Sequence, residues 1–332
     1  MSAPRLREHP DELQALTQVV AEGSGIPIAF IEKDFWAIEV LRVASADRPI
    51  SQPDGSRATV RFAFKGGTSL SRVFGIIDRF SEDIDLLVLF PDLLSTGARE
   101  RSLKAVQDDV RQHLNLKVGD VSASQQTKGI KRAVRYSYRG VASPNDALSE
   151  GVLLEMGSRG GDEPLIVHSL RSLVAEYAIE RLGDSSEIWE EFSAFRLNVL
   201  GPERTLLEKL SAVHTACADT TAISDRLSQH GRHFYDIHRL LESEHVRDRL
   251  EQLGVAGVEK LAEDIHSRGI DAGWASVPRP KEGYASSPAF SDAGDIGRVV
   301  RDSYEKASNL IYGEPITIEE CLASVRRYSQ LI

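Results

Sequence analysis

A glycine turn between two predicted strands is the feature that most constrains how this chain folds. Apolar residues fill every second position of 60–64, which is the period-two pattern of a half-buried strand. Gly66 and Gly67 follow at once, and two glycines let the backbone turn tightly and come close to a ligand. We therefore expect a strand that runs into a ligand-facing turn.

A helix is expected directly after this turn. Thr68 or Ser69 is a suitable N-cap, and Arg72 adds a positive charge one turn in. An apolar stripe follows at the i, i+3, i+4 and i+7 spacing of one helix face, formed by Leu70, Val73, Phe74 and Ile77. Free N–H groups and the helix dipole at such an amino end favour an anion. The turn and helix thus indicate a phosphate-binding loop.

The next segment, 81–88, holds two carboxylates side by side. Residues two apart on a strand point to the same face, so Asp83 and Asp85 share one face and the apolar residues between them lie on the other. Like charges held this close need a cation or hydrogen-bond donors to stabilise them. Mg²⁺ is typically held by one or two carboxylates and completed by substrate phosphates. The aspartate pair therefore predicts a Mg²⁺ site beside the phosphate loop.

A third acid is expected from the predicted strand 151–157. Glu155 is a lone acid between Leu154 and Met156. We expect it to complete the acidic metal site or to act as a base for an incoming hydroxyl, and the alternative is a glutamate that simply faces solvent. The glycine turn and the Asp-x-Asp pair are each weak signals alone, but their occurrence in this order favours phosphoryl chemistry.

Together these residues resemble the polymerase-β-like nucleotidyltransferases, and within them the AbiEii-type toxins of abortive-infection systems and the MenT-like toxins of toxin–antitoxin systems. Several phrases carry the resemblance in chain order. They are EKDFW at 32–36, GGTSL at 66–70, RFSEDIDL at 79–86, TLLEKL at 205–210, RHFYD at 232–236 and NLIYGEP at 309–315. The likeness thus spans the chain from about residue 28 to its carboxyl end.

The resemblance implies an α/β fold with two parts. The first, residues 1–175, is expected to be a polymerase-β-like nucleotidyltransferase core, a mixed sheet with flanking helices and an amino-terminal helical extension. The second, residues 176–332, is expected to be mainly helical and to complete the active-site cleft.

The resemblance also implies roles for individual residues. Asp83 and Asp85, with Glu155, would hold Mg²⁺. The nucleotide would lie against Gly66, Gly67, Thr68, Ser69, Arg72 and Ser81. A phosphate placed on Ser81 would block that site through its charge.

Two residues of the second part are implied to act beside these. Lys209 would contact the triphosphate, and Asp236 would lie near the nucleotide or the acceptor. Without the resemblance, Lys209 reads as a lysine whose stem lies on the surface, and Asp236 as one partner of an intrahelical ion pair with Arg232 or Arg239.

The implied function is that of a Mg²⁺-dependent toxin that transfers NMP from an NTP to an acceptor hydroxyl. In the MenT-like relatives the acceptor is the 3′ end of tRNA, whose modification blocks translation and growth. Such a toxin implies an antitoxin partner and a role in phage defence. Alternatives are a protein or small-molecule hydroxyl as acceptor, transfer of the γ-phosphate instead, a binding module without catalysis, and a purely structural partner protein.

Composition limits where RNA can bind. The chain of 332 residues has a net charge of −10 and a pI near 5.5, so a global basic field is absent and RNA contact must be local. The best local candidate is a basic strand face formed by Lys128, Lys131, Arg132, Arg135 and Arg139, with Tyr136 and Tyr138 between them. The alternative is an edge strand whose charges protect it from aggregation.

The remaining composition points to the cytoplasm. Cys217 and Cys321 are too few and too separated for a disulfide framework or a cysteine metal site, which favours a reducing compartment. The apolar runs are much shorter than a membrane span, and residues 1–20 are polar and charged, unlike a signal peptide. We expect no membrane contact.

Overall fold

The chain folds into two compact units. The computed structural model describes residues 3–52, 55–79, 81, 83–138, 140, 149–217, 223–308, 311 and 314–332. The sheet unit comprises Met1–Thr68, Ser81–Ser158 and Ile166–Val199, and the helical unit comprises Ser69–Phe80, Arg159–Leu165 and Leu200–Ile332. The main change of unit lies after Val199 and not at the expected residue 175, because strand β8 (Phe195–Leu200) pairs with β2 (Arg57–Lys65) in the sheet.

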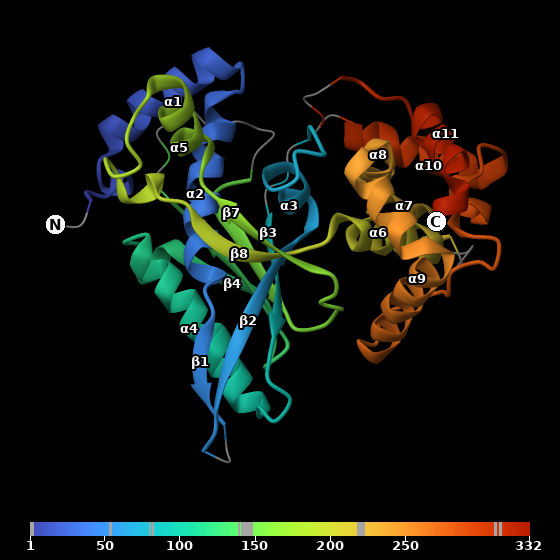
Figure 1. Ribbon diagram of the computed structural model, residues 1–332, viewed down its shortest axis with the longest axis horizontal. Helices are drawn as coiled ribbons and strands as arrows, with labels where there is room; N and C mark the ends of the chain where they lie inside the picture. Colours follow the sequence, from blue (N-terminus) through green and yellow to red (C-terminus); the bar gives the residue numbers. More distant parts are fainter. Residues whose placement is uncertain are drawn as a thin grey trace. The chain divides into compact units, whose positions relative to one another are not determined.

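A mixed eight-stranded sheet forms the centre of the sheet unit (Figure 1). The strand order is β4-β5-β6-β3-β2-β8-β7, and β1 pairs with β2 outside this path. The remaining strands are β1 (Arg48–Ser51), β3 (Asp83–Leu89), β4 (Val121–Thr127), β5 (Lys131–Tyr136), β6 (Val152–Gly157) and β7 (Leu165–Leu170). Strand β3 runs antiparallel to β2 and parallel to β6, so the expected mixed sheet is confirmed.

One face of this sheet is apolar and packs against helices. Phe62 and Phe64 of β2, Ile84 and Leu86 of β3, and Leu154 of β6 are all buried. Helix α2 (Ile28–Ala44) packs on β3 and β6, and α4 (Thr96–His113) packs on β5 and on α2. The predicted alternation is confirmed for the apolar face and leaves Asp83 and Asp85 on the other face, although Ala63 and Leu87 on that face are also buried.

Helix α2 is buried even where its residues are charged. Lys33 Nζ donates to the carbonyl of Ser149 at 2.6 Å. Asp34 Oδ2 accepts from the backbone N–H of Leu173 at 2.6 Å, where α5 (Leu173–Tyr177) begins. Lys33 and Asp34 of the EKDFW phrase therefore serve the packing of the sheet unit, because their side chains bind backbone groups of other segments.

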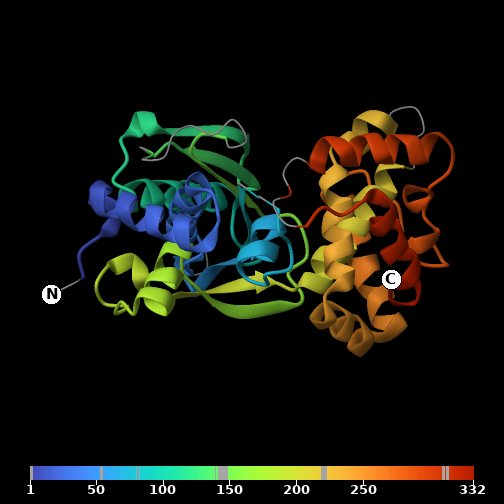
Figure 2. The same ribbon diagram turned by 90° about the horizontal axis from the view of Figure 1, so that it is seen from above.

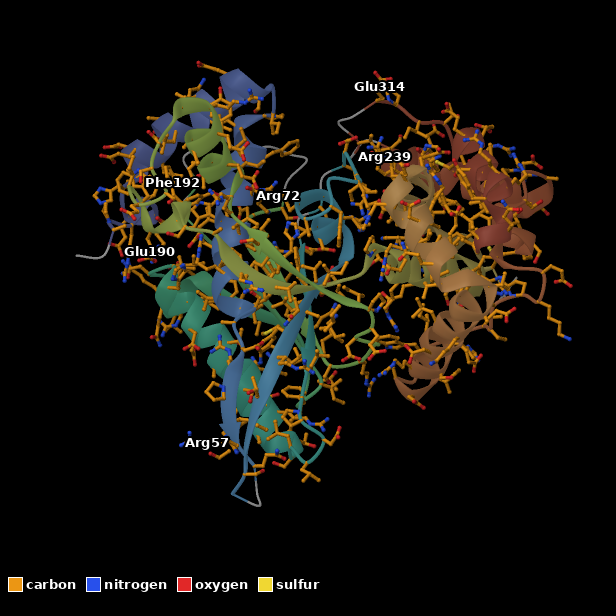
Figure 3. The ribbon with its side chains drawn as sticks, viewed as in Figure 1. Arg57, Arg72, Glu190, Phe192, Arg239 and Glu314 are labelled. Atoms are coloured by element: carbon orange, nitrogen blue, oxygen red, sulfur yellow. The ribbon has the colours of Figure 1, made fainter. Side chains whose placement is uncertain are left out.

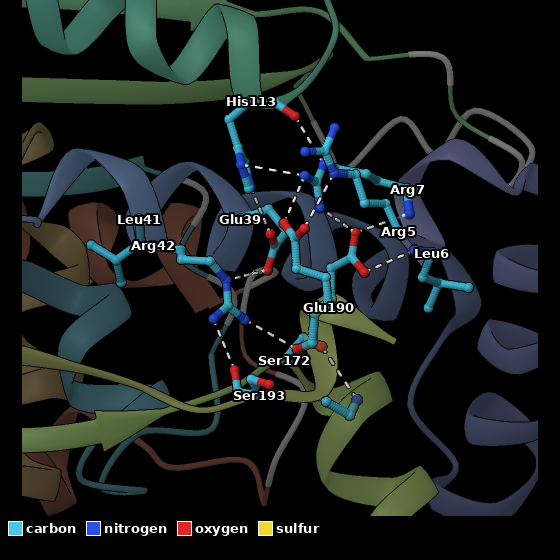
Figure 4. Close-up of polar contacts among 12 residues, drawn as sticks. Arg5, Leu6, Arg7, Glu39, Leu41, Arg42, His113, Ser172, Glu190 and Ser193 are labelled. Carbon is cyan, nitrogen blue, oxygen red and sulfur yellow. Dashed lines mark hydrogen bonds and ion pairs between the residues drawn. The ribbon is translucent and has the colours of Figure 1, made fainter. Parts of the chain in front are cut away.

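A buried ion network fastens the amino-terminal segment to the sheet unit (Figure 4). Arg7 lies between Glu191, with Nη1 2.6 Å from Oε1, and the carbonyl of His113, to which Nε donates at 2.8 Å. His113 Nε2 contacts Glu39 Oε2 at 2.8 Å, and Arg42 Nε donates to Glu39 Oε1 at 2.9 Å. The segment Leu6–Glu8, which precedes α1 (Pro10–Ser24), is thus joined to α2, α4 and the segment around residue 191 through buried polar contacts.

The helical unit is built from packed helices around one apolar core (Figure 2). Its described helices are α6 (Pro202–Ala216), α7 (Ile223–Ser228), α8 (Gly231–Glu242), α9 (Glu244–Asp271), α10 (Gly294–Ser308) and α11 (Ile318–Arg327). Helix α6 begins at Pro202, a residue favoured at the first position of a helix, and it buries Leu206 and Leu210. Leu70, Ile76 and Ile77 also belong to this core, so a segment from the middle of the sheet sequence folds into the helical unit.

Candidate functional site

The register of the sheet places charged residues in a row across three strands. Asp85 lies opposite Lys65 of β2 on one side and opposite Glu155 of β6 on the other. Asp83 lies two residues earlier on the same face of β3, and both aspartates are half-buried. The expected strand placement of the three acids is confirmed, and Lys65 adds a positive charge at the end of the row.

Gly66 lets the chain turn directly against this row. Its φ is +83°, a conformation that favours glycine. A Cβ atom built on Gly66 would lie 2.3 Å from Oδ2 of Asp85, so a side chain here would collide with the carboxylate. Gly67 is buried beside it. The glycine at position 66 thus allows the backbone to approach the aspartate more closely than another residue could.

Helix α3 (Gly66–Arg72) starts earlier and ends sooner than the sequence predicts. It begins at Gly66, so Thr68 and Ser69 lie inside it and are not N-caps. It ends at Arg72 because Gly75 adopts a φ of +60° and the N–H of Ile76 bonds to the carbonyl of Leu70 at 2.9 Å, a helix-ending turn. The predicted apolar stripe over residues 70–77 is therefore wrong as a helix face, although Leu70 and Ile77 are buried.

Thr68 ties this helix to the strand that carries the aspartates. Its Oγ1 donates to the carbonyl of Asp83 at 2.6 Å and lies 3.3 Å from the carbonyl of Ser81. Thr68 and Ser69 are buried, whereas Arg72, labelled in Figure 3, and Ser81 are half-buried. Of the predicted nucleotide-binding residues, Thr68 thus has a clear structural task in fixing the start of β3 against α3.

Glu155 is engaged by a lysine of the neighbouring strand. Its Oε1 lies 3.3 Å from Nζ of Lys131 on β5. Across the residues that the structure describes, His, Cys, Asp and Glu side chains form no group of three or more that could hold a metal ion. Asp83 and Asp85 fit the one or two carboxylates that Mg²⁺ takes from protein, and the backbone of Gly66 lies close to Asp85. The register places Glu155 next to Asp85, while its carboxylate is held by Lys131.

The predicted basic strand face is divided between the two faces of β5. Lys131 and Arg135 lie on the same face as Glu155, and Lys128 is exposed in the turn before the strand. Arg132 lies on the opposite face, where it is buried and forms an ion pair with Glu100 of α4. Arg139 is outside the described residues. Alternation along the strand therefore removes Arg132 from the face that its neighbours share.

Lys209, Asp236 and Arg79 form a buried ion triad in the helical unit. Asp236 on α8 is fully buried. Its Oδ1 accepts from Arg79 Nε at 2.6 Å, and its Oδ2 accepts from Arg79 Nη2 at 2.7 Å and lies 2.7 Å from Lys209 Nζ. The predicted intrahelical ion pair of Asp236 with Arg232 or Arg239 is wrong, because both carboxylate oxygens of Asp236 contact residues from other segments.

The triad has a strong electrostatic consequence. Burial alone would raise the pKa of Asp236, but the adjacent charges and hydrogen bonds of Lys209 and Arg79 hold the pKa of that carboxyl well below its usual range. Asp236 is therefore ionised at neutral pH and offsets one of the two cations. The triad retains one net positive charge, which suits the lysine of a phosphate-binding site.

The same helix also holds the segment that leads into the aspartate strand. Arg239, labelled in Figure 3, donates from Nε to the carbonyl of Ile76 at 2.8 Å, and its Nη2 lies 2.8 Å from Asp78 Oδ2. The hydroxyl of Tyr235 accepts from the backbone N–H of Asp78 at 3.0 Å. Tyr235 of the RHFYD phrase and Arg239, three residues after it, thus fix the segment 76–78 through both backbone and side-chain groups.

The sequence did not reveal which residues Arg79, Lys65 and Lys131 would contact or flank. Arg79 is in the RFSEDIDL phrase, but only the structure shows that its partner is Asp236, 157 positions away. Lys65 continues the alternation of β2 on its polar face, so the strand pattern held the signal that it would flank Asp85. The pairing of Lys131 with Glu155 depends on the order of β5 and β6, which no local pattern gives.

A comparison with protein families identifies the family of the chain. A family model described as nucleotidyl transferase AbiEii toxin, type IV toxin–antitoxin system, matches residues 56–314. The chain belongs to this AbiEii family. No curated protein matches the chain.

The AbiEii match covers most residues discussed above. It includes the glycine turn, the aspartate strand, Glu155, Lys209 and Asp236, whereas the EKDFW phrase of α2 lies outside it. Membership in a nucleotidyl transferase toxin family of type IV toxin–antitoxin systems implies an NTP substrate, a divalent metal and an antitoxin partner. Among the described residues, none of the helices is both long and apolar enough to span a membrane.

Proposed function

We propose that this AbiEii-family protein is a Mg²⁺-dependent nucleotidyltransferase that transfers NMP from an NTP to the 3′-terminal hydroxyl of tRNA. The observation that supports this best is the row in which Asp85 lies between Lys65 and Glu155, with Gly66 turned against it. Carboxylates beside a glycine turn suit a metal-bound triphosphate.

Asp83 and Asp85 would hold the divalent cation, and Glu155 would join them or accept the proton of the incoming hydroxyl. Bound there, the cation would offset the charge that develops on the phosphates during in-line displacement. The acceptor oxygen forms a bond to the α-phosphorus, the bond from that phosphorus to the bridging oxygen breaks, and pyrophosphate leaves.

The nucleotide would be held by the turn and by cations. Because the side chains of Thr68 and Ser69 are buried, we propose that Gly66, Gly67 and Ser69 act through backbone N–H groups. Arg72 and Lys209 would contribute positive charge, and Ser81 would border the site. Asp236 has no carboxylate oxygen left for substrate, so we propose that it positions Lys209 and Arg79.

The acceptor would contact the polar face of β5 and the turn before it. Lys128, Lys131 and Arg135 are the cations there that are not buried, whereas Arg132 is buried on the other face of β5 and paired with Glu100. Extension of the tRNA end would prevent aminoacylation and stop translation in the cytoplasm. An antitoxin encoded nearby would restrain the toxin, and growth arrest would serve phage defence.

Incubation of the purified protein with Mg²⁺, each α-³²P-labelled NTP in turn and total tRNA tests this proposal. Label that enters tRNA with the wild type, but not with Asp83→Ala, is the expected result. Asp92→Ala is the matched control, because Asp92 is an exposed aspartate shortly after the same strand and lies outside the proposed site.

The other acceptors are separated by further arms of the same experiment. Label in a protein or small molecule would replace tRNA as the acceptor, and label that enters only from γ-³²P-NTP would indicate phosphotransfer. Equal labelling by wild type and Asp83→Ala would contradict the proposed site. For the RNA surface, charge reversal at Lys128 and Arg135 is expected to reduce labelling of tRNA while leaving the fold intact, since neither side chain is buried.

A further inference from the structure

Lys131 lies on β5, the strand next to the edge strand β4. It extends from β5 across the polar face, with Nζ 3.3 Å from Glu155 Oε1 and donating to Gln125 Oε1 of β4 at 2.9 Å. The direct cross-strand neighbour of Glu155 is Ala133, so Lys131 reaches Glu155 diagonally. Gln125 of β4 and Glu155 of β6 thus hold the ammonium group of Lys131 from the two flanking strands.

This ion pair competes with the position that a third metal carboxylate needs. Asp85 and Glu155 are register partners on adjacent parallel strands, which puts their side chains on one face. Yet the described residues contain no group of three acids able to hold a metal, which agrees with Glu155 being drawn toward β5. The carboxylate of Glu155 can therefore pair with Lys131 on the β5 side or with a divalent cation bound at the aspartates on the β3 side.

The pair is open enough to exchange. The side chains of Lys131 and Glu155 are 36% and 29% exposed, so solvent screens their attraction and the pair contributes little to stability. A divalent cation carries twice the charge of an ammonium group and binds carboxylate oxygens directly. Such a cation at Asp83 and Asp85 can recruit Glu155 by displacing Lys131.

We propose that Lys131 is a built-in competitor of the divalent cation for Glu155. The lysine keeps the third carboxylate off the aspartate pair until a metal displaces it, and so sets the metal affinity of the site. This inference rests on the proposed function, because it requires a divalent-cation site at Asp83 and Asp85.

Mn²⁺ binding to the full-length protein without nucleotide tests the inference, with free Mn²⁺ measured by electron paramagnetic resonance. Lys131→Met is expected to tighten Mn²⁺ binding roughly fivefold, since one nearby positive charge and one competitor are removed. Lys131→Arg keeps a cation at this position and is expected to bind as the wild type does.

Two further variants separate competition for Glu155 from a general charge effect. In a Glu155→Gln background, Lys131→Met is expected to change Mn²⁺ affinity less than twofold, because the contested carboxylate is gone. Arg135→Met removes a cation from the same face of β5 whose Nη1 donates to the carbonyl of Glu150, and it is expected to leave the affinity within twofold of the wild type. Thermal unfolding of each variant checks that it is folded.

The outcomes distinguish this inference from the proposed function. Equal Mn²⁺ binding by wild type and Asp83→Ala would overturn the metal site itself. Binding that depends on Asp83 but is unchanged or weakened in Lys131→Met would overturn the competitor role alone. An equal gain from Lys131→Met with and without Glu155 would also overturn it, because the effect would then not act through that acid.

Discussion

At the scale of single residues, Asp236 shows how partners decide the role of a charged side chain. The RHFYD phrase marks it as important, but its carboxylate receives three contacts from Arg79 and Lys209 and is fully buried. Such a residue acts by placing two cations. Its position on an amphipathic helix was predictable, whereas partners 157 and 27 positions away were not, because they depend on the tertiary fold.

Asp236→Asn is expected to destabilise the protein by roughly 3–5 kcal/mol, because it leaves two buried cations without their counter-charge. Chemical denaturation at neutral pH measures this change. Asp78→Asn is the matched control: the Asp78 side chain is 43% exposed in its pair with Arg239, so a loss within about 1 kcal/mol is expected. Similar losses for both variants would contradict the importance of the triad.

The stability difference between the wild type and Asp236→Asn is expected to depend on pH. The pKa of Asp236 is lowered in the folded state by Lys209 and Arg79, against the effect of burial, so the unfolded chain binds its proton more readily. The stabilising contribution is therefore complete above the unfolded pKa of about 4 and is lost as the pH falls below it. The difference in unfolding free energy between wild type and Asp236→Asn should be constant from pH 7 to about pH 5 and shrink below about pH 4. A difference that stays constant well into the acid range would show that Asp236 is not ionised in the fold.

At the scale of elements, strands were more predictable than the short helix between them. Period-two alternation gave the apolar face of β2 and β3 correctly, because Phe62, Phe64, Ile84 and Leu86 are all buried, although Ala63 and Leu87 on the other face are buried too. The stripe at 70–77 suggested a longer helix, but α3 ends at Arg72. Gly75 allows a left-handed turn, and Ile76 and Ile77 then enter the core of the helical unit. Apolar spacing alone does not reveal such a stop.

The turn at Gly66 is expected to be sensitive to a single methyl group. Gly66→Ala combines a positive φ, which costs about 1–2 kcal/mol in an L-residue, with overlap against the Asp85 carboxylate. Gly75→Ala is the control, because its φ is also positive but its added Cβ would contact nothing within 4 Å. Both variants should lose stability in denaturation, while only Gly66→Ala should also weaken Mn²⁺ binding. Unchanged Mn²⁺ binding in Gly66→Ala would separate the turn from the proposed metal site.

At the scale of the whole molecule, the order of units along the chain differs from a simple two-part division. Membership in the AbiEii family confirms the predicted class of fold, a mixed sheet with helices and a helical region. The expected boundary at 175 treats the chain as two consecutive pieces. Instead the segments Ser69–Phe80 and Arg159–Leu165 belong to the helical unit although sheet strands surround them in sequence. Local patterns identify elements, but they do not show which core an insertion joins.

This interleaving predicts that the sheet unit cannot be isolated by a simple truncation. A fragment of residues 1–199 keeps all but the last residue of the last strand, but it removes the apolar partners of Leu70, Ile76 and Ile77 and the acid that pairs with Arg79. Exposed apolar surface and a buried cation without its partner both favour unfolding or aggregation. We expect this fragment to bind a hydrophobic dye and to lack a cooperative thermal transition, whereas the full chain shows one. A fragment that unfolds cooperatively without binding dye would show that residues 69–80 do not depend on the helical unit for their structure.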